Sequence, residues 1–391
     1  MNIHAIISIV DILLWIIIAA NVVYLLLFSL ASLLPKKKQQ PLSITDQHST
    51  FLVLFPAYHE DAVILNSVRC FLQQDYPQEY YRVVVVSDHM QPETNQALAL
   101  MPITLLQPSF ERSSKAKALQ YAIEQNGGTY DYVIILDADN VVKSDFLTSL
   151  NQIVNKNEAF QCHRTAKNAN NDIAALDGLS EEINNSIFRR GHNRIGMSSA
   201  LIGSGMCFNY QWFKKHVGLL DSAVEDRELE TLLIKQGLYI HYIEDIYVTD
   251  EKVSDSDTFQ RQRLRWMTGQ VQALCRMIPY LPKAIIGANI NYIDKTIQQA
   301  LIPRSILLVI TPVFTMIATL YTLDFSGFAI KWWIVFILLI LSIFAAIPAP
   351  LRNKALIRKI TTLPLLVWRM LKNISHIRLG NKEFIHTTHQ Q

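Results

Sequence analysis

Short apolar segments alternate with amphipathic ones through the region that follows residue 50. Four apolar runs rich in β-branched and aromatic residues predict strands at 51–55, 83–86, 103–106 and 132–136. Between these runs, amphipathic segments predict helices at 62–73, 93–100 and 115–124. This alternation is typical of an α/β fold in which helices cover both faces of a mostly parallel sheet. Polar and acidic residues follow the predicted strands, at the edge where such sheets bind ligands.

Much longer apolar runs lie near the start of the chain and in its last third. Residues 12–34, 305–323 and 332–349 carry no charge, and each is close to the roughly 20 residues that cross a bilayer. Residues 324–331 separate the last two runs, which predicts a helical hairpin. The alternative for any single run is a buried core helix. Because the first run lacks the basic segment and cleavage site of a signal peptide, we expect a retained anchor.

Basic residues gather beside these apolar runs. Residues 36–38 are three lysines, and the tail from residue 351 carries eight Lys or Arg and one Asp or Glu, hence +7. The whole chain is +3, which leaves −4 for everything before the tail. The basic excess therefore lies beside the membrane and not on a nucleic-acid-binding face. Because positive flanks stay in the cytoplasm, we expect the N-terminus outside, with residues 36–304 and the tail inside.

The second half of the predicted soluble region is less regular. Its pattern predicts mixed strands and helices over 160–250 and a helix over about 258–276. Residues 280–302 and 351–372 are amphipathic, which predicts helices that lie along the membrane surface. The four cysteines show no paired spacing, so we expect a reducing compartment and neither zinc nor disulfides.

Two carboxylates end the predicted strand at 132–136. Asp137 and Asp139 stand at i and i+2 on a strand-to-loop turn, where they can share a hard cation through oxygen ligands. Mg²⁺ or Mn²⁺ suits such a site when phosphates complete the coordination. The alternative is a helix cap or an Asx turn.

Two later motifs carry further candidate chemistry. Glu225 and Asp226 are adjacent acids, and one could act as a general base on an acceptor hydroxyl; the alternative is a solvated helix start. On the predicted helix at 258–276, Gln262 and Arg265 share one face, and arginine can bind diphosphate oxygens in a bidentate manner. Trp266 offers a flat face for a sugar ring, although an interfacial helix would carry the same residues.

In this order, a strand-ending DxD, an ED pair and a QxxRW helix resemble the membrane-bound family 2 glycosyltransferases. That group includes cellulose, hyaluronan and poly-N-acetylglucosamine synthases and ceramide glucosyltransferases. The resemblance covers residues 51–267 and implies a cytoplasmic GT-A domain, a Rossmann-like mixed sheet with helices on both faces, joined to transmembrane and interfacial helices. The expected organisation is an anchor at 1–35, a linker at 36–50, the GT-A domain at 51–279, an interfacial region at 280–304, a transmembrane hairpin at 305–350 and a basic tail at 351–391.

The resemblance extends to the nucleotide-binding segments. The segment at 55–60 is similar to the family's first-strand segment, which implies that Ala57, Tyr58 and Glu60 contact the nucleoside. There His59 replaces the usual Asn. Asp88 resembles the acid that recognises the base.

Two more segments match the family. The segment 115–120 resembles the stretch whose lysine, here Lys115, reaches the donor phosphates, although Ser114 replaces its Gly. Gly203, Ser204 and Gly205 resemble a segment near the acceptor pocket, and an ordinary tight turn is the alternative.

The resemblance also implies a role for each motif. Asp139 would bind the metal, Asp137 would support the nucleotide or metal, and Asp226 would be the base. Gln262 and Arg265 would hold the diphosphate. Glu225 and Trp266 would form the acceptor site.

The implied reaction is a single displacement that inverts the anomeric centre, with UDP as the favoured nucleotide. The acceptor is a lipid or a growing glycan, and the expected location is a bacterial inner membrane. One alternative is a processive polysaccharide synthase, for which three spans give little channel wall unless an oligomer or export partner completes it. An alternative of another class is an inactive membrane scaffold.

Overall fold

The computed structural model describes residues 3–36, 47–154, 159–167, 172–252, 256–322 and 327–352. Most of the expected linker and nearly all of the basic tail, with its predicted helix, lie outside the described residues. Within the described part, one eight-stranded sheet has the strand order β3-β2-β1-β4-β7-β6-β8-β5. Its strands are β1 (Phe51–Tyr58), β2 (Tyr81–Asp88), β3 (Thr104–Leu106), β4 (Tyr132–Ile135), β5 (Val141–Val142), β6 (Ala159–Ala166), β7 (Met206–Asn209) and β8 (Ile240–Asp250).

The sheet is parallel in its first half and mixed in its second. Strands β1, β2, β3 and β4 pair in parallel, as the alternating pattern predicts. Strand β7 then runs antiparallel to β4 and β6, while β6 and β8 are parallel. The predicted α/β class and the GT-A arrangement of a mixed sheet between helices are confirmed.

Alternate residues of β1 face opposite helical layers, because side chains alternate along a strand. Phe51, Val53 and Phe55 pack toward one layer, formed by α2 (Ile64–Phe71), α3 (Pro92–Ala99) and α5 (Phe146–Asn151). Leu52 and Leu54 pack toward the other layer, formed by α4 (Lys115–Gln125), α8 (Tyr210–His216) and α9 (Glu225–Lys235). Short 3₁₀ turns η1 (Gln78–Tyr80) and η3 (Val217–Leu219) join elements of these layers.

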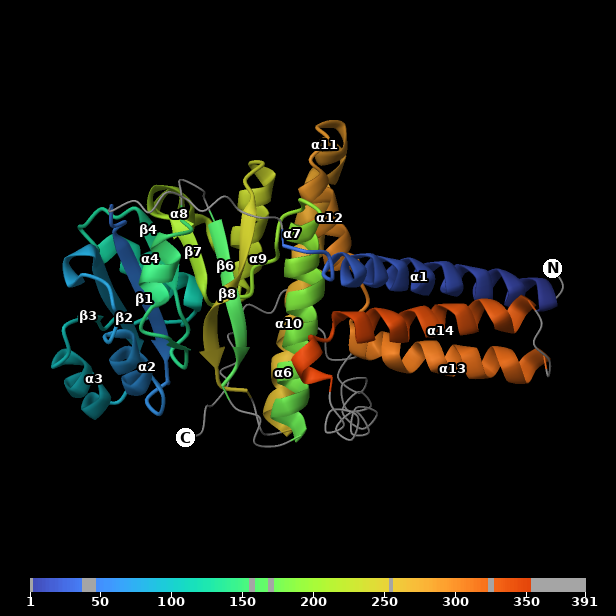
Figure 1. Cartoon of the computed structure of the whole chain (residues 1–391), viewed down its shortest axis with the longest axis horizontal. Coiled ribbons are helices and arrows are strands. Elements are labelled where there is room, and N and C mark those ends of the chain that lie inside the picture. Colours follow the sequence, from blue (N-terminus) through green and yellow to red (C-terminus); the bar gives the residue numbers. More distant parts are fainter. Residues whose placement is uncertain are drawn as a thin grey trace.

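Three described helices are long and apolar enough to cross a membrane. They are α1 (Ile3–Ala31), α13 (Arg304–Thr322) and α14 (Gly327–Ala346). They lie side by side in one bundle that extends away from the sheet, with the 3₁₀ turn η5 (Ala349–Leu351) after α14 (Figure 1). Trp332 is buried in the bundle, and its indole nitrogen donates to Asp11 at 2.8 Å. The outward faces carry exposed Ile, Leu and Val, as expected of helices surrounded by lipid.

A layer of upright helices separates the sheet from this bundle (Figure 1). It contains α10 (Ser256–Met277) and a continuous helical stretch made of α6 (Asp172–Asn184), the π-helical η2 (Asn185–Gly191) and α7 (His192–Arg194). The sequence pattern predicts α10 but does not single out the stretch from α6 to α7.

The amphipathic segment at 280–302 forms two short helices. The chain forms η4 (Ile278–Tyr280), α11 (Leu281–Ile286) and α12 (Ile290–Ala300). The break falls at residues 287–289, where Ala288 has a positive φ of 49° and Asn289 caps α12 by accepting from Tyr292 N at 3.0 Å. Tyr292 is buried against the second helical layer of the sheet, so this segment is part of the folded domain.

Candidate active site

One cavity of about 520 Å³ lies beyond the carboxyl ends of the parallel strands and reaches the membrane helices. Every predicted site residue lines it except Ser204 and Gly205. The residues brought together are Ala57, Tyr58, Glu60, Asp88, Lys115, Asp137, Asp139, Gly203, Glu225, Asp226, Gln262, Arg265 and Trp266.

Lys115 joins three of the motifs. Ser114 caps α4 by accepting from Lys117 N at 3.2 Å, so Lys115 is the first residue of that helix. Its Nζ lies 2.5 Å from Asp137 Oδ1 and 3.2 Å from Glu225 Oε1, and it donates to the Gly203 carbonyl at 2.6 Å. Burial alone would lower the pKa of Lys115, but the two carboxylates outweigh it and raise the pKa. A fixed cation therefore stands at the centre of the cavity.

The loop at 203–205 positions a backbone carbonyl and does not present Ser204 or Gly205 to the cavity. Gly203 and Gly205 have φ of +82° and +64°, a conformation that L side chains rarely adopt. Ser204 is fully buried, and its hydroxyl bonds to Asn140. Gly205 N donates to the Ile135 carbonyl at 2.9 Å, which holds the loop against β4.

Asp139 is placed where a divalent cation could bind. It is buried, with Oδ1 accepting from Asn140 at 3.1 Å and Oδ2 from Glu251 N at 2.9 Å. Asp250, at the end of β8, also lines the cavity and interacts electrostatically with Asp139. Its Oδ1 is buried without a hydrogen-bond partner among the described residues. The carboxylates of Asp139 and Asp250 therefore suit a hard cation, because cations such as Mg²⁺ and Mn²⁺ prefer oxygen ligands.

The described residues contain no cluster of three His, Cys, Asp or Glu that could hold a metal by itself. That fits a Mg²⁺ or Mn²⁺ site, because such ions are commonly held by one or two carboxylates together with substrate phosphates. Asp250 is the last residue of β8, and Asp137 lies two residues after the end of β4. An acid at the end of an apolar strand pattern is the sequence signal that could have identified Asp250.

Glu225 and Asp226 begin α9 and differ in their surroundings. Glu225 is buried, and burial raises the pKa of its carboxyl against the opposing effect of Lys115. Asp226 is partly exposed, and its Oδ1 accepts from Arg227 N at 2.8 Å. Its Oδ2 faces Gly203 across the cavity. Of the two acids, Asp226 is therefore the one with access to an incoming hydroxyl.

Helix α10 lines the cavity with the QxxRW side chains. Gln262 Oε1 is buried and has no hydrogen-bond partner within the described chain, so it can accept from a bound molecule. Burial lowers the pKa of Arg265, opposed by Glu225, Asp137 and Asp226. Trp266 packs against the guanidinium of Arg263, 4.7 Å from its ring centre.

Aromatic rings gather at the ends of β1 and β2. Asp88 is buried, and its Oδ1 lies 2.6 Å from His89 Nδ1. The rings of Tyr58 and His59 each lie 5.6 Å from that of His89. Both histidines have positive φ, 54° and 56°, which is uncommon for residues with a side chain. His89 belongs to none of the motifs found in the sequence.

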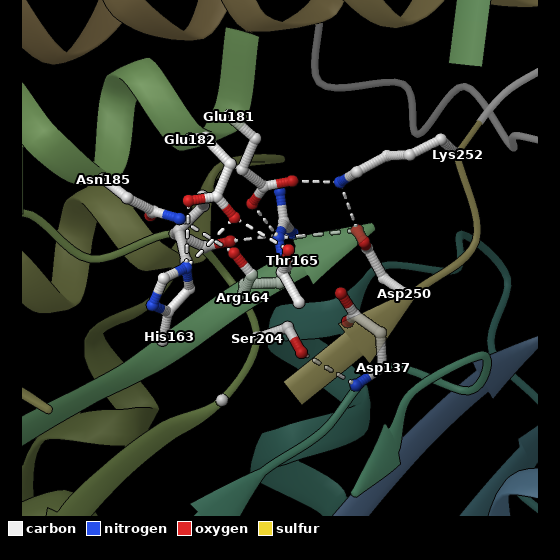
Figure 2. Close-up of polar contacts among 12 residues, drawn as sticks. Asp137, His163, Arg164, Thr165, Glu181, Glu182, Asn185, Ser204, Asp250 and Lys252 are labelled. Atoms are coloured by element: carbon white, nitrogen blue, oxygen red, sulfur yellow. Dashed lines mark hydrogen bonds and ion pairs between the residues drawn. The ribbon is translucent and has the colours of Figure 1, made fainter. Parts of the chain in front are cut away.

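A buried ion-pair network supports the cavity behind Asp250 (Figure 2). Arg164 Nε donates to Glu181 Oε1 at 2.5 Å and lies 3.5 Å from Asp250 Oδ2. Lys252 contacts Glu181 and donates to Asp250 at 2.8 Å. Burial, with Glu181 as the next cause, raises the pKa of Asp250 to about 7.

The network ties α6 to β6 and to the end of β8. In addition, His163 Nε2 lies 3.0 Å from Glu182 Oε1, and Thr165 donates to the same oxygen at 2.7 Å. No local sequence pattern predicts this network, because its members lie as far as 89 residues apart, from His163 to Lys252.

Comparison with known proteins gives concordant findings. The sequence profile described as "Glycosyltransferase like family 2" matches residues 48–269, which is more than half of the chain. An N-acetylglucosaminyltransferase from Rhizobium meliloti (strain 1021) is 24% identical over 313 residues, covering 74% of this chain and 69% of that protein.

Among solved structures, the mannosyltransferase PcManGT from Pyrobaculum calidifontis, in complex with GDP-Man and Mn²⁺, has the same fold. It is 18% identical, with a TM-score of 0.54, and the match covers 84% of this chain and 94% of that one. The match over residues 48–269 and the mixed sheet together place this chain in the family 2 glycosyltransferases.

Proposed function

We propose that this chain is an inverting, metal-dependent glycosyltransferase that moves a sugar from a nucleoside diphosphate to a lipid at the cytoplasmic membrane surface. One observation carries the choice of acceptor: the cavity that contains Asp226 is continuous with an apolar end between the membrane helices. Leu25 of α1, Leu308 of α13 and Ile343 of α14 line that end, together with Ile347 directly after α14.

The residues of the cavity divide into a donor end and an acceptor end. Tyr58 and Asp88 would hold the nucleoside at the ends of β1 and β2. Lys115 and Arg265 would stabilise the diphosphate as negative charge develops on it. Asp139 and Asp250 would hold a divalent cation, which neutralises charge on the leaving diphosphate.

Asp226 would act as the general base. An acceptor hydroxyl loses its proton to this carboxylate while its oxygen attacks the anomeric carbon. The bond from that carbon to the phosphate oxygen breaks, and the nucleoside diphosphate leaves with the electron pair. One displacement inverts the anomeric configuration, so an α-linked donor gives a β-glycoside.

The relatives suggest which donors to test first. The Rhizobium meliloti relative is named an N-acetylglucosaminyltransferase, which supports UDP-N-acetylglucosamine as the first donor. The Pyrobaculum calidifontis structure holds GDP-Man and Mn²⁺, which supports GDP-mannose as the second donor and Mn²⁺ as the first metal.

The test measures sugar transfer by the purified full-length chain with a panel of nucleotide sugars, Mn²⁺ or Mg²⁺, and membrane lipid extract. We expect a glycolipid product that excess chelator abolishes. Replacing Asp226→Asn keeps the shape and removes the base, so turnover should fall about 10²-fold or more with donor binding retained. Asp221→Asn is the matched control, because Asp221 is exposed and does not line the cavity.

The same reaction mixtures separate the competing functions. Long, lipid-free polymers would replace this proposal with a processive synthase. No donor turnover with any sugar and metal would favour an inactive scaffold. Near-normal turnover of Asp226→Asn would show that Asp226 is not the general base, although the protein would still be a glycosyltransferase.

A further inference from the structure

The membrane end of the cavity contains an arginine that has no acidic partner within the described chain. Arg304 is the first residue of α13 and lines the cavity. Its Nη2 donates to the Ser180 carbonyl at 3.0 Å, to Ser180 Oγ at 3.3 Å and to Asn184 Oδ1 at 2.7 Å. These acceptors are neutral, so they orient the guanidinium without compensating its charge, and no described acid forms an ion pair with it. The remaining nitrogens of Arg304 make no hydrogen bond to the described residues.

The surroundings of Arg304 are electropositive. Arg263 also lines the cavity and is near enough to repel Arg304 electrostatically. Asp177 forms an ion pair with Arg263, so the three side chains carry one net positive charge. The amino end of α13, a 19-residue helix, adds its own partial positive charge. An anion is therefore the ligand that this end of the cavity favours.

The residues next to this charge are apolar and come from the membrane bundle. Leu25 lies in the last part of α1, Leu308 in the first part of α13, and Ile347 directly after α14. The end of each of the three helices that lies nearest the catalytic domain therefore borders the cavity. Leu176 and Leu179 of α6 face the cavity from the other side. A small hydrophilic anion would leave this lining unused, whereas hydrocarbon chains would cover it.

The catalytic helix is tied directly to this end. Gln270, one turn after Trp266 on α10, donates to the carbonyls of Gln299 at 3.0 Å and Leu301 at 2.8 Å. Gln299 lies in the last turn of α12, and Leu301 is the first residue of the link from α12 to α13, three residues before Arg304. The position of the anion site is therefore coupled by short contacts to the helix that carries the QxxRW residues.

From this combination we infer that the acceptor is a lipid whose headgroup carries both a phosphate and a free hydroxyl, with the phosphate bound at Arg304 and Arg263. The hydrocarbon chains lie against the apolar lining, and the hydroxyl extends toward Asp226. Its proton passes to Asp226 while its oxygen bonds to the anomeric carbon and the nucleoside diphosphate leaves. The inference rests on the proposed function and narrows its acceptor to anionic lipids.

The test measures lipid binding to the purified full-length protein in detergent, without donor, by native mass spectrometry. The probes are short-chain phosphatidylglycerol, diacylglycerol of the same chain length, and glycerol phosphate. We expect phosphatidylglycerol to bind more tightly than either of the others. Arg304→Gln should weaken its binding about ten-fold or more, because a hydrogen-bonded charge is lost, and leave diacylglycerol binding unchanged. Arg304→Lys keeps the charge and should retain part of the affinity.

Arg352→Gln is the matched control. Arg352 is an exposed arginine just past η5, at the same end of the bundle, and does not line the cavity. Equal losses in the two Gln variants would overturn the site in favour of general attraction to anionic lipid. Equal binding of phosphatidylglycerol and diacylglycerol would overturn the anion preference. Glycerol phosphate binding as tightly as the lipid would overturn the lipid assignment.

Lipid binding and transfer to lipid test the acceptor assignment, whereas donor turnover tests the proposed function. Asp226→Asn should bind phosphatidylglycerol as the parent does, since Asp226 acts only on the hydroxyl. Lipid binding without transfer to that lipid, in a protein that turns over donor, would overturn the acceptor assignment alone. Loss of all donor turnover would instead be a failure of the proposed function. Unfolding temperatures of each variant show whether a loss of binding comes from a loss of folding.

Discussion

Lys115 connects residues that lie far apart in the sequence. Its ammonium contacts Asp137, Glu225 and the Gly203 carbonyl, which belong to three separate motifs. A buried cation stays charged only when carboxylates compensate it. The one ammonium therefore bridges the carboxylates of Asp137 and Glu225. A nucleoside diphosphate that enters would meet a cation that is already positioned, which reduces the reorganisation needed for its binding.

Asp139 gives the sharpest test of the metal position. Asp139→Ala removes a carboxylate that we expect to bind the cation directly. Metal-dependent binding of nucleoside diphosphate should weaken at least about 10-fold, the loss that even an outer partner of a metal ligand causes. Calorimetry with UDP, with and without Mn²⁺, measures this.

Asp145→Ala is the control for Asp139, because Asp145 is an exposed acid six residues further along. It should bind UDP and metal as the parent does. Binding of UDP by Asp139→Ala that still responds fully to Mn²⁺ would show that the cation lies elsewhere.

Among the elements, the π-helical turn η2 is where the catalytic domain meets the first membrane helix. His192, directly after η2, stacks on Phe28 of α1 with ring centres 3.6 Å apart. Its Nε2 also lies 3.1 Å from Asp294 Oδ2, and Tyr24 of α1 donates to Asp294 at 2.8 Å. These contacts join α1, α7 and α12 through buried polar groups.

Gly191 allows this close approach, which gives a prediction for the element. A Cβ at this position would overlap the carbonyl oxygen of Phe28. Gly191→Ala should therefore destabilise the contact between η2 and α1, with an overpacking cost of about 1–3 kcal/mol. Thermal unfolding in detergent should show a lower midpoint for this variant.

The control is a glycine in the link from α4 to β4. A Cβ at Gly127 would meet no heavy atom within 4 Å, and Gly127→Ala should leave the midpoint nearly unchanged. A midpoint for Gly191→Ala equal to that of the parent would mean that α1 can move away from η2 without cost.

Elements with a local signal could be predicted from the sequence, and elements held by distant partners could not. Strands β1 to β4 have compact apolar runs, and their predicted ranges agree with the structure to within three residues at each end. Helix α6 gave no comparable signal, because it buries Glu181 and Glu182, acids that usually mark a solvent-exposed face. Glu181 pairs with Arg164 of β6 and with Lys252 after β8. Glu182 pairs with His163 and Thr165 of β6, so only the folded sheet brings these partners together.

The predicted site residues also divide into those with a local sequence signal and those whose position depends on distant parts of the chain. Most of them stand at strand ends or helix starts, where position alone suggests chemistry, and the structure brings these to one cavity. Ser204 and Gly205 matched a motif, yet the turn directs them into the protein. Arg304 was predicted only as the last residue of the interfacial region at 280–304, since its role depends on which residues of α6 contact it.

At the scale of the whole molecule, the three membrane helices and the cavity impose one orientation. The ends of α1, α13 and α14 that border the cavity lie beside the catalytic domain, so that domain and those ends share one side of the membrane (Figure 1). In the sequence, the lysines at 36–38 directly follow the first apolar run and the basic tail follows the last one, and positive flanks of this kind predict the cytoplasmic side. Nucleotide sugars are made there, so a donor would reach the cavity without crossing the bilayer.

Reporter fusions test this orientation. A reporter active only in the cytoplasm should work when fused after Gln391 and fail when inserted at 323–326, in the link from α13 to α14. A reporter active only outside should show the reverse pattern at both sites. Each fusion protein must retain sugar transfer, so that a misinserted chain is not scored. Activity of the cytoplasmic reporter at 323–326 alone would place the catalytic domain outside. The lipid acceptor would then have to be drawn from the outer leaflet, and the donor would have to be exported to meet it.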